Sequence, residues 1–343
     1  MTGATGFVGA GVARLLLSEG FAVRVLARKG SDRKNIEGLP VDVAQGDVRD
    51  PGSLAAACRG ARYVFHVAAD YRIWVKDPGE MLATNVGGSL NVLDAAIGAK
   101  VERIIHCSSV AAVKPLENRQ AADESSEYSE PDELIGFYKK SKWLSERAVL
   151  DRAKHGAPVV IVNPAAPIGP YDIKPTPTGR IVLDFLNGRM PSYIDTGLNV
   201  VHVQDVALGH YLAALKGRIG ERYILGGENL TFKQVLDTLA EATGMTAPKF
   251  RTPYPIAYAF AAMDTLRARL FGGEPLAPLD AVRMARRPMY FDSSKAAREL
   301  GYRPRAARQA LQDGAEWFAE NGYVGRPEKA PTKPVAPVTN AIP

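Results

Sequence analysis

The sequence predicts an α/β protein with a doubly wound parallel sheet, followed by a smaller and mostly helical C-terminal domain. Two observations support this prediction. The segment Thr2-Gly3-Ala4-Thr5-Gly6-Phe7-Val8-Gly9 leads directly into an apolar helical stretch, and short apolar runs then alternate with amphipathic ones as far as residue 165. Strands that alternate with helices are typical of a parallel sheet covered on both faces.

Five apolar runs are the predicted strands of this sheet, because each is short, rich in Val, Ile and Leu, and bounded by turn residues. They are Ala22–Leu26, Val41–Ala44, Tyr63–Val67, Arg103–Cys107 and Pro158–Val162. Amphipathic stretches between them, such as Val12–Leu17 and Ser89–Ala96, are predicted helices. Gly20 is expected to end the first helix, and Gly156 a later one.

The strand that should lead into the glycine segment is nearly missing, because Met1 stands directly before Thr2-Gly3. We hypothesise that the natural start lies upstream, and that a GTG valine codon at the end of this strand was read as Met1. Sequencing the native N-terminus tests this, and finding Met1 there would contradict it.

Gly3, Gly6 and Gly9 form a G-x-x-G-x-x-G loop at the start of the first helix, as in Rossmann-type folds. Glycine allows a tight turn and close approach, and a helix N-terminus offers free N–H groups to a pyrophosphate. A dinucleotide is therefore expected here. The residues expected to line it are Gly3, Thr5, Gly6, Phe7, Val8, Gly9, Arg28, Asp47, Val48, Ala68 and Ala69.

The end of the second strand bears on which nucleotide binds. NAD-binding proteins usually carry an acid at this point, which holds the ribose 2′-hydroxyl. Here the run ends in Arg28-Lys29, and the planar guanidinium of Arg28 suits a 2′-phosphate. The sequence therefore favours NADP(H). NAD(H) is the alternative, with Arg28 then facing solvent.

Tyr138 and Lys142 lie four residues apart, so a helix places both on one face. A free tyrosine, with a pKa near 10, is a poor base at neutral pH, and a nearby ammonium favours its phenolate. Ser109 follows Ser108 at the end of a predicted strand and can hydrogen-bond a substrate oxygen. Together with the glycine loop, these residues indicate a nicotinamide-dependent oxidoreductase or epimerase.

These motifs resemble the extended short-chain dehydrogenase/reductases over nearly the whole chain except the tail. Asn85-Val86-Gly87-Gly88-Ser89 and His202-Val203-Gln204-Asp205-Val206-Ala207 are similar to two further signatures of that family. The resemblance implies that Ser109, Tyr138 and Lys142 are catalytic and that Asn85 supports them. It also implies that Asn85, Tyr138 and Lys142 contact the nucleotide, and that the chain is a homodimer through the helix that carries Tyr138.

Within that family, four blocks look like the hopanoid-associated sugar epimerase group, itself similar to dihydroflavonol 4-reductases. They are residues 66–74, 174–180, 184–191 and 220–231. Two departures from nucleotide-sugar epimerases favour a carbonyl reductase: Val110-Ala111-Ala112-Val113-Lys114 replaces their Tyr-Gly, and Asn163-Pro164 replaces their Arg-Pro. An NAD-dependent epimerase or dehydratase acting on a hopanoid-linked or nucleotide sugar is the alternative. A nucleotide-sensing scaffold without turnover is a third.

Much of the second half of the chain is predicted to bind the substrate. Ala165–Gly179 is rich in Pro, Gly and Thr and resembles an active-site loop, whereas Val200–Leu215 and Arg222–Leu225 resemble further units of the sheet. Thr231–Tyr302 is expected to be mostly helical. We therefore predict a dinucleotide-binding domain at 1–165 and 200–227, a substrate-binding cap at 166–199 and 228–324, and a flexible tail at 325–343.

Five residues are expected to contact the substrate. Tyr71 and Trp74 follow the strand at 63–67 and suit a large ring-bearing ligand, although Trp74 has core packing as an equal reading. Lys174, Thr176 and Arg180 lie in the proline-rich loop or just after it and suit an anionic or polyhydroxylated group. Simple surface solvation is their alternative.

The composition indicates which kinds of partner and which cellular compartment to expect. The 343 residues are 46% hydrophobic and 23% charged, as in soluble globular proteins, and two cysteines and five histidines show no disulfide or metal spacing. A cytoplasmic enzyme with a small-molecule substrate and without metal is expected. The net charge of +6 is scattered, which disfavours nucleic acid. Ile256–Phe271 is expected to be a cap helix, or alternatively an interfacial helix on the anionic inner membrane.

Overall fold

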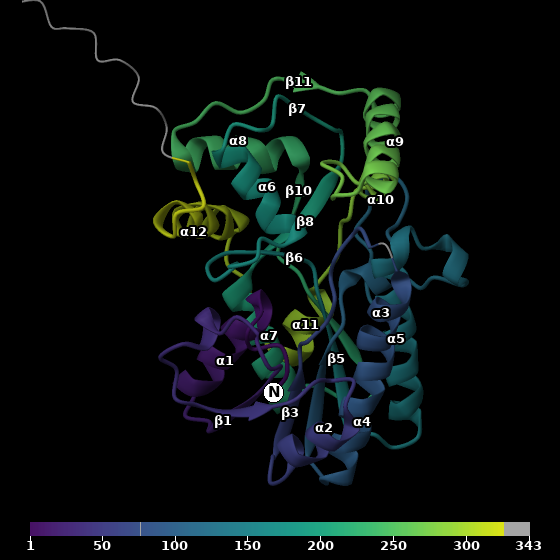
Figure 1. Ribbon diagram of the computed structural model, residues 1–343, viewed down its shortest axis with the longest axis vertical. Coiled ribbons are helices and arrows are strands. Elements are labelled where there is room, and N and C mark those ends of the chain that lie inside the picture. Colours follow the sequence, from purple (N-terminus) through teal and green to yellow (C-terminus); the bar gives the residue numbers. More distant parts are fainter. Residues whose placement is uncertain (76, 326–343) are drawn as a thin grey trace, which may run out of the picture.

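The computed structural model describes residues 1–75 and 77–325. The tail predicted at 325–343 therefore lies outside the described residues except for Gly325. Figure 1 shows a lower body built on a sheet and an upper body of helices and short strands. Within the described residues, no helix is long and apolar enough to cross a bilayer.

The main sheet confirms the predicted parallel α/β architecture. Every strand pair in it is parallel, and the order is β2-β1, then β3-β4-β5-β9. The strands are β1 (Val23–Ala27), β2 (Val41–Gln45), β3 (Tyr63–His66), β4 (Arg103–Cys107), β5 (Val159–Pro164) and β9 (Arg222–Leu225). All five strands predicted in the first half are present to within one or two residues.

Thr2 stands where the central strand of this sheet belongs. It forms a parallel bridge to Leu26 on one side and to His66 on the other, so it joins β1 to β3. The amide of Thr2 donates to Phe65, and the carbonyl of Met1 accepts from the amide of Leu26. One residue thus closes the sheet in the order expected of a Rossmann fold.

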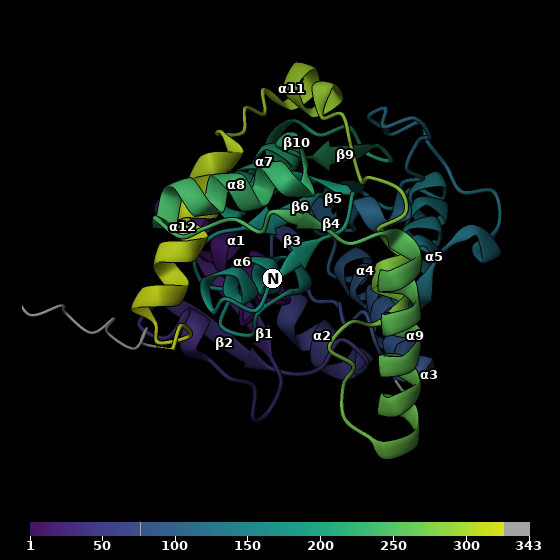
Figure 2. The same ribbon diagram turned by 90° about the horizontal axis from the view of Figure 1, so that it is seen from above.

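Helices cover both faces of the sheet (Figures 1 and 2). The first face carries α1 (Phe7–Ser18) and α7 (Val203–Lys216), which pack on each other and bury Val25, Ile105 and Val160. The second face carries α2 (Pro51–Cys58), α4 (Gly88–Gly98) and α5 (Gly136–Lys154). Gly20 and Gly156 have positive φ just beyond α1 and α5, which agrees with their predicted role as helix ends.

The upper body is built on a separate sheet of β6 (Ala166–Ile168), β8 (Gly197–His202) and β10 (Glu228–Thr231). This corrects the expectation that 200–215 adds a strand–helix unit to the main sheet. Helix α7 does pack against the main sheet, but β8 pairs with β6 and β10. The buried side-chain amide of Asn199 on β8 donates to the side chain of Asn229 on β10 and to the carbonyl of Phe291. Alternating apolar residues do not specify which sheet a strand joins.

Helices α6 (Pro177–Leu186), α8 (Phe232–Thr243) and α12 (Ala307–Glu320) pack around this second sheet. Local sequence explains where two of them begin. Thr176 caps α6 with Pro177 at its first position, and Thr231 with Gln234 forms a capping box on α8. Gly244 ends α8 in the left-handed conformation.

Helices α8, α9 (Tyr254–Phe271), α10 (Leu279–Met284) and α11 (Ser294–Leu300) confirm that 231–302 is mostly helical. Two short strands of the upper body, β7 (Ser192–Tyr193) and β11 (Phe250–Arg251), pair with each other. Helix α11 lies against α7 and β9 of the lower body. Its residue Leu300 belongs to the apolar core between the main sheet and the helices α1 and α7. The division of the chain into two domains at the predicted boundaries stays a prediction.

Candidate active site

The glycine loop has the geometry of an anion-binding turn. Gly3 has φ of +77°, and a Cβ on it would lie 2.6 Å from the amide nitrogen of Ala68. A Cβ on Gly9 would collide with the Gly3 carbonyl. Gly6 is the N-cap of α1, and a Cβ on it would lie 3.3 Å from the Gly3 carbonyl oxygen, a tight but milder contact. The first turn of α1 holds no acidic residue and no side-chain cap, which suits a pyrophosphate.

The other residues expected to hold the nucleotide surround this loop. Ala68 and Ala69 follow β3, and the amide of Ala68 donates to Thr2 at 3.2 Å. Arg28 is exposed directly after β1. Asp47 follows β2, where the hydrogen bond and charge of Arg49 lower its carboxyl pKa, and Val48 is buried against Gly88 of α4. Thr5, Phe7 and Val8 complete the loop and the first turn.

Ser109, Tyr138 and Lys142 come together where β4 ends. The Lys142 ammonium is buried and donates to the carbonyl of Cys107 at 2.9 Å. Burial raises the pKa of Tyr138, and the hydroxyl of Ser109, acting as a hydrogen-bond partner, opposes that rise. Burial also lowers the pKa of Lys142. The lowering of the tyrosine pKa that we expect from Lys142 stays a prediction for the nucleotide-bound enzyme.

The side chain of Asn85 connects the loop after β3 to helix α5, which carries Tyr138. Asn85 lies in a π-helical turn (Ala83–Gly87) and is buried. Its side chain accepts from the amide of Asp70 at 2.7 Å and donates to the carbonyl of Asp70 and the hydroxyl of Ser141, each at 2.8 Å. Single π-turns inside helices are frequent at functional sites. The supporting role expected of Asn85 stays a prediction.

A buried ionic network that sequence reasoning missed supports the same helix. Glu146, one turn beyond Lys142, is 1% exposed. Its carboxylate accepts from Arg222 at 2.8 Å and from the Asn163 amide at 2.6 Å, and that amide also donates to the carbonyl of Ser109 at 3.0 Å. The i, i+4, i+8 spacing of Tyr138, Lys142 and Glu146 was visible in the sequence, but its partners were not.

Sequence reasoning also missed a hydrogen-bonded group around His66, the last residue of β3. His66 shares its ring nitrogens with Thr2 at 2.8 Å and with Ser89 at 3.0 Å, and Ser89 also accepts from Ser145. Burial lowers the pKa of His66 to about 3, so the ring is neutral. A neutral hydrogen-bonded chain therefore connects the strand residue before the glycine loop to α5.

The expected substrate residues are only partly brought together. The Tyr71 hydroxyl donates to the carbonyl of Lys174 at 3.4 Å, so these two segments adjoin, and Trp74 is half-buried in the same loop as Tyr71. The hydroxyl of Thr176 donates to buried Asp172 and caps α6, which makes its first role structural. Arg180 is exposed on α6. A substrate role for all five stays a prediction.

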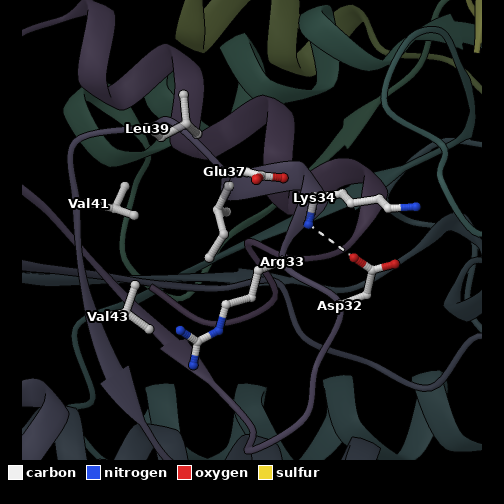
Figure 3. Close-up of a pocket in the computed structure, with 8 residues that line it drawn as sticks. Asp32, Arg33, Lys34, Glu37, Leu39, Val41 and Val43 are labelled. Atoms are coloured by element: carbon white, nitrogen blue, oxygen red, sulfur yellow. Dashed lines mark hydrogen bonds between the residues drawn. The ribbon is translucent and has the colours of Figure 1, made fainter.

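A hollow of about 430 Å³ lies elsewhere, at the outer edge of the main sheet (Figure 3). It forms where the short turn Lys34–Ile36 passes beside β2, and the amide of Lys34 donates to Asp32 there. Its lining comprises Asp32, Arg33, Lys34, Ile36, Glu37, Leu39, Val41 and Val43. None of these is a predicted catalytic or nucleotide-binding residue.

The fold and the site define a nicotinamide-dependent enzyme of the short-chain dehydrogenase/reductase type. Residues 1–226 match the NAD dependent epimerase/dehydratase family, and the chain belongs to that family. This confirms the expected extended short-chain dehydrogenase/reductase class and the expected Rossmann-type fold.

Three proteins are similar to this chain over nearly its whole length. A Synechocystis sp. protein provisionally named dihydroflavonol 4-reductase is 45% identical over 94% of this chain and 95% of its own length. Sterol demethylase protein B of Methylococcus capsulatus is 37% identical over 94% and 99%. The crystal structure of gox2253 superposes with a TM-score of 0.85 and 46% identity, over 94% of this chain and 98% of that one.

Proposed function

We propose that the protein is an NADP(H)-preferring carbonyl reductase. The meeting of Ser109, Tyr138 and Lys142 at the carboxyl end of β4 carries the oxidoreductase chemistry. Arg28 supports NADP(H), and Asn163 supports reduction over epimerisation. When bound, the nicotinamide supplies the hydride. The residues of the chain then supply the proton, the orientation of the carbonyl and the binding of the ribose.

The proton comes from Tyr138. Because burial raises the pKa of Tyr138, the phenol is protonated at neutral pH and ready to act as a general acid. The Ser109 hydroxyl donates to the substrate carbonyl oxygen and holds it near the phenol. Lys142, fixed on the Cys107 carbonyl, presents a positive charge beside the phenolate that forms, and this charge stabilises it.

Asn163 supports reduction over nucleotide-sugar epimerisation. The family's epimerases tend to carry arginine at this position, whereas Asn163 is fully buried and its amide serves Ser109 and Glu146. It is therefore occupied inside the protein and does not reach a substrate phosphate. The name of the 45% identical relative also points to a reductase.

For the substrate we propose an apolar, ring-bearing ketone. Tyr71 and Trp74 provide aromatic surface near the cofactor loop. The names of the two curated relatives refer to a flavonoid and to a sterol, both ring systems. A hopanoid-related ketone belongs to the same chemical class and is the first candidate to assay.

The test is NADPH oxidation with a panel of polycyclic and aromatic ketones, compared with the same panel and NADH. Turnover with NADPH that disappears in Tyr138→Phe is expected. Native mass spectrometry of the purified protein adds an independent readout. Exchangeable NADP(H) supports the reductase, and tightly retained NAD supports the alternative.

That alternative is an NAD-dependent epimerase or dehydratase acting on a nucleotide sugar or a hopanoid-linked sugar. The family match favours it. In that reaction Tyr138 first removes the proton of a sugar hydroxyl and later returns it. Conversion of a nucleotide sugar without net consumption of nicotinamide would establish it.

We further propose a homodimer through α4 and α5. Ile97 on α4 and Phe137 on α5 are large apolar side chains exposed by 41% and 46%. Sedimentation velocity of the wild type and of Ile97→Asp tests this proposal. A wild-type monomer would exclude the dimer.

A further inference from the structure

Helix α9 turns its apolar face outward. Ile256, Phe260, Met263 and Leu270 follow a spacing of three, four and seven residues, so they lie on one side of the helix. Their exposed fractions are 62%, 51%, 67% and 68%. Leu266, Phe271 and, just after the helix, Leu276 extend this surface. Surface helices of globular proteins normally show the reverse pattern, with the apolar side on the core.

The inward face of α9 explains why the helix is held this way round. It consists of Ala261, Asp264, Thr265 and Ala268. Asp264 accepts from the amide of Ala277 at 3.0 Å and from Arg267, and Thr265 accepts from the amide of Leu279 at 3.0 Å. These polar contacts to the turn before α10 fix the rotation of α9 about its axis. The large apolar side chains therefore face away from the rest of the protein.

Positive charge is concentrated around the same surface. Between residues 249 and 287 the chain has seven Lys or Arg and three Asp or Glu, a net +4 in a chain whose total is +6. Four of the arginines pair with acids. Among the described residues, Lys249, Arg269 and Arg286 form no ion pair. Arg269 lies on α9 itself, and Arg286 lines a hollow with Tyr254 at the start of that helix.

We propose that the outer face of α9 docks on an anionic lipid surface. A contiguous apolar patch rimmed by cations is the pattern of an interfacial helix, which buries its apolar side chains at the headgroup boundary while Lys and Arg contact anionic lipids. Figure 2 shows α9 along the outside of the molecule, clear of the main sheet, which suits contact with a flat surface. The proposal does not depend on which reaction the enzyme catalyses.

A second copy of the chain fits this face less well. A two-fold interface sets the same patch against itself, so the cations of one copy would face those of the other. An anionic bilayer meets both the apolar and the charged requirement. Asp280 of α10 lies next to Gly136, and α10 packs on α9, so the inward side of α9 is connected through α10 to the start of the helix that carries Tyr138.

The test is flotation of the full-length protein with phosphatidylglycerol-containing vesicles and with pure phosphatidylcholine vesicles, at low and high salt. We expect binding to the anionic vesicles that weakens with salt, and a loss of about tenfold or more in the double variant Met263→Glu/Leu270→Glu. The matched control is Leu215→Glu/Ile219→Glu, which alters two exposed apolar residues of the lower body. The control is expected to bind as the wild type does.

Three results would overturn the proposal. One is a wild-type protein that stays out of the anionic vesicles, and another is equal loss of binding in both double variants. The third is a wild-type oligomer in sedimentation velocity that Met263→Glu/Leu270→Glu dissolves without any vesicle binding, since it assigns the face to a second copy. All the changed residues are exposed, and thermal melts confirm that each variant is folded.

Discussion

Strand β5 of the lower body and helix α9 of the upper body use their apolar residues in opposite ways. In the lower body, all six residues of β5 are buried, and helices cover both faces of the sheet. In the upper body, the 18-residue helix α9 buries only Ala261, Asp264, Thr265 and Ala268. Hydrophobic burial thus shapes the first half, whereas specific polar contacts orient this part of the second.

The polar groups of the two halves differ as well. The lower body encloses charged and hydrogen-bonded groups beneath the catalytic helix, among them Glu146, Arg222 and His66. The ion pairs of α10 and α12 join side chains that are exposed by 32% to 64%. We infer that the chemistry resides in the lower body, and the following changes test this contrast.

The largest effect is expected from Tyr138→Phe, which removes the proton donor and leaves the ring. Turnover should fall by about a hundredfold to ten-thousandfold, the range for loss of a general acid. Nucleotide affinity, measured by fluorescence titration, should change little. If turnover survives, the acid lies elsewhere and the proposed mechanism is wrong.

Breaking the buried ion pair should come next. Glu146→Ala removes the buried carboxylate partner of Arg222, which keeps only the exposed carboxylate of Glu127, and should lower the free energy of unfolding by about 3–5 kcal/mol. The control Glu241→Ala breaks the exposed pair with Arg308 and should cost about 1 kcal/mol or less. Urea denaturation of both variants measures the difference. Equal costs would remove the contrast between the two halves.

Asp172 makes stability depend on pH. Burial raises the pKa of this carboxyl from 3.8 to about 6, despite its hydrogen bonds from Thr176. Between these values the folded protein holds a proton that the unfolded chain releases, so this contribution to stability is lost as pH rises. The loss approaches about 3 kcal/mol by pH 7.

Asp172→Asn isolates this contribution. The stability of the wild type relative to the variant should decline between pH 4 and pH 7, as measured by urea midpoints. Parallel curves would show that the carboxyl titrates normally in the folded protein.

The smallest effect is expected at Arg28, which is exposed and contributes to cofactor choice alone. Arg28→Ser should weaken NADP(H) binding by about tenfold, near 1.4 kcal/mol, and leave NAD(H) binding unchanged. Lys29→Ser, one residue further along, is the matched control and should change neither. An equal effect on both nucleotides would indicate a role other than holding a 2′-phosphate.

Much of the lower body could be predicted because its signals are local. The glycine loop, the strand runs and the Tyr138–Lys142 spacing each occupy a few consecutive residues, and each has a physical meaning without its neighbours. The structure brings Ser109 to Tyr138 as expected. The partners of Asn163 could not be predicted, because Asn163, Glu146 and Arg222 are joined only by folding.

The sequence by itself determined the class of fold, the order of the strands and helices of the first half, and the residues of the proposed catalytic group. Only the tertiary structure decided that Thr2 completes the sheet, that β8 leaves it for the second sheet, and that α9 faces outward. The physical reason is the same in each case. Periodicity specifies that a face is apolar, but the hydrogen bonds of distant residues select the surface against which it lies, or whether it is covered at all.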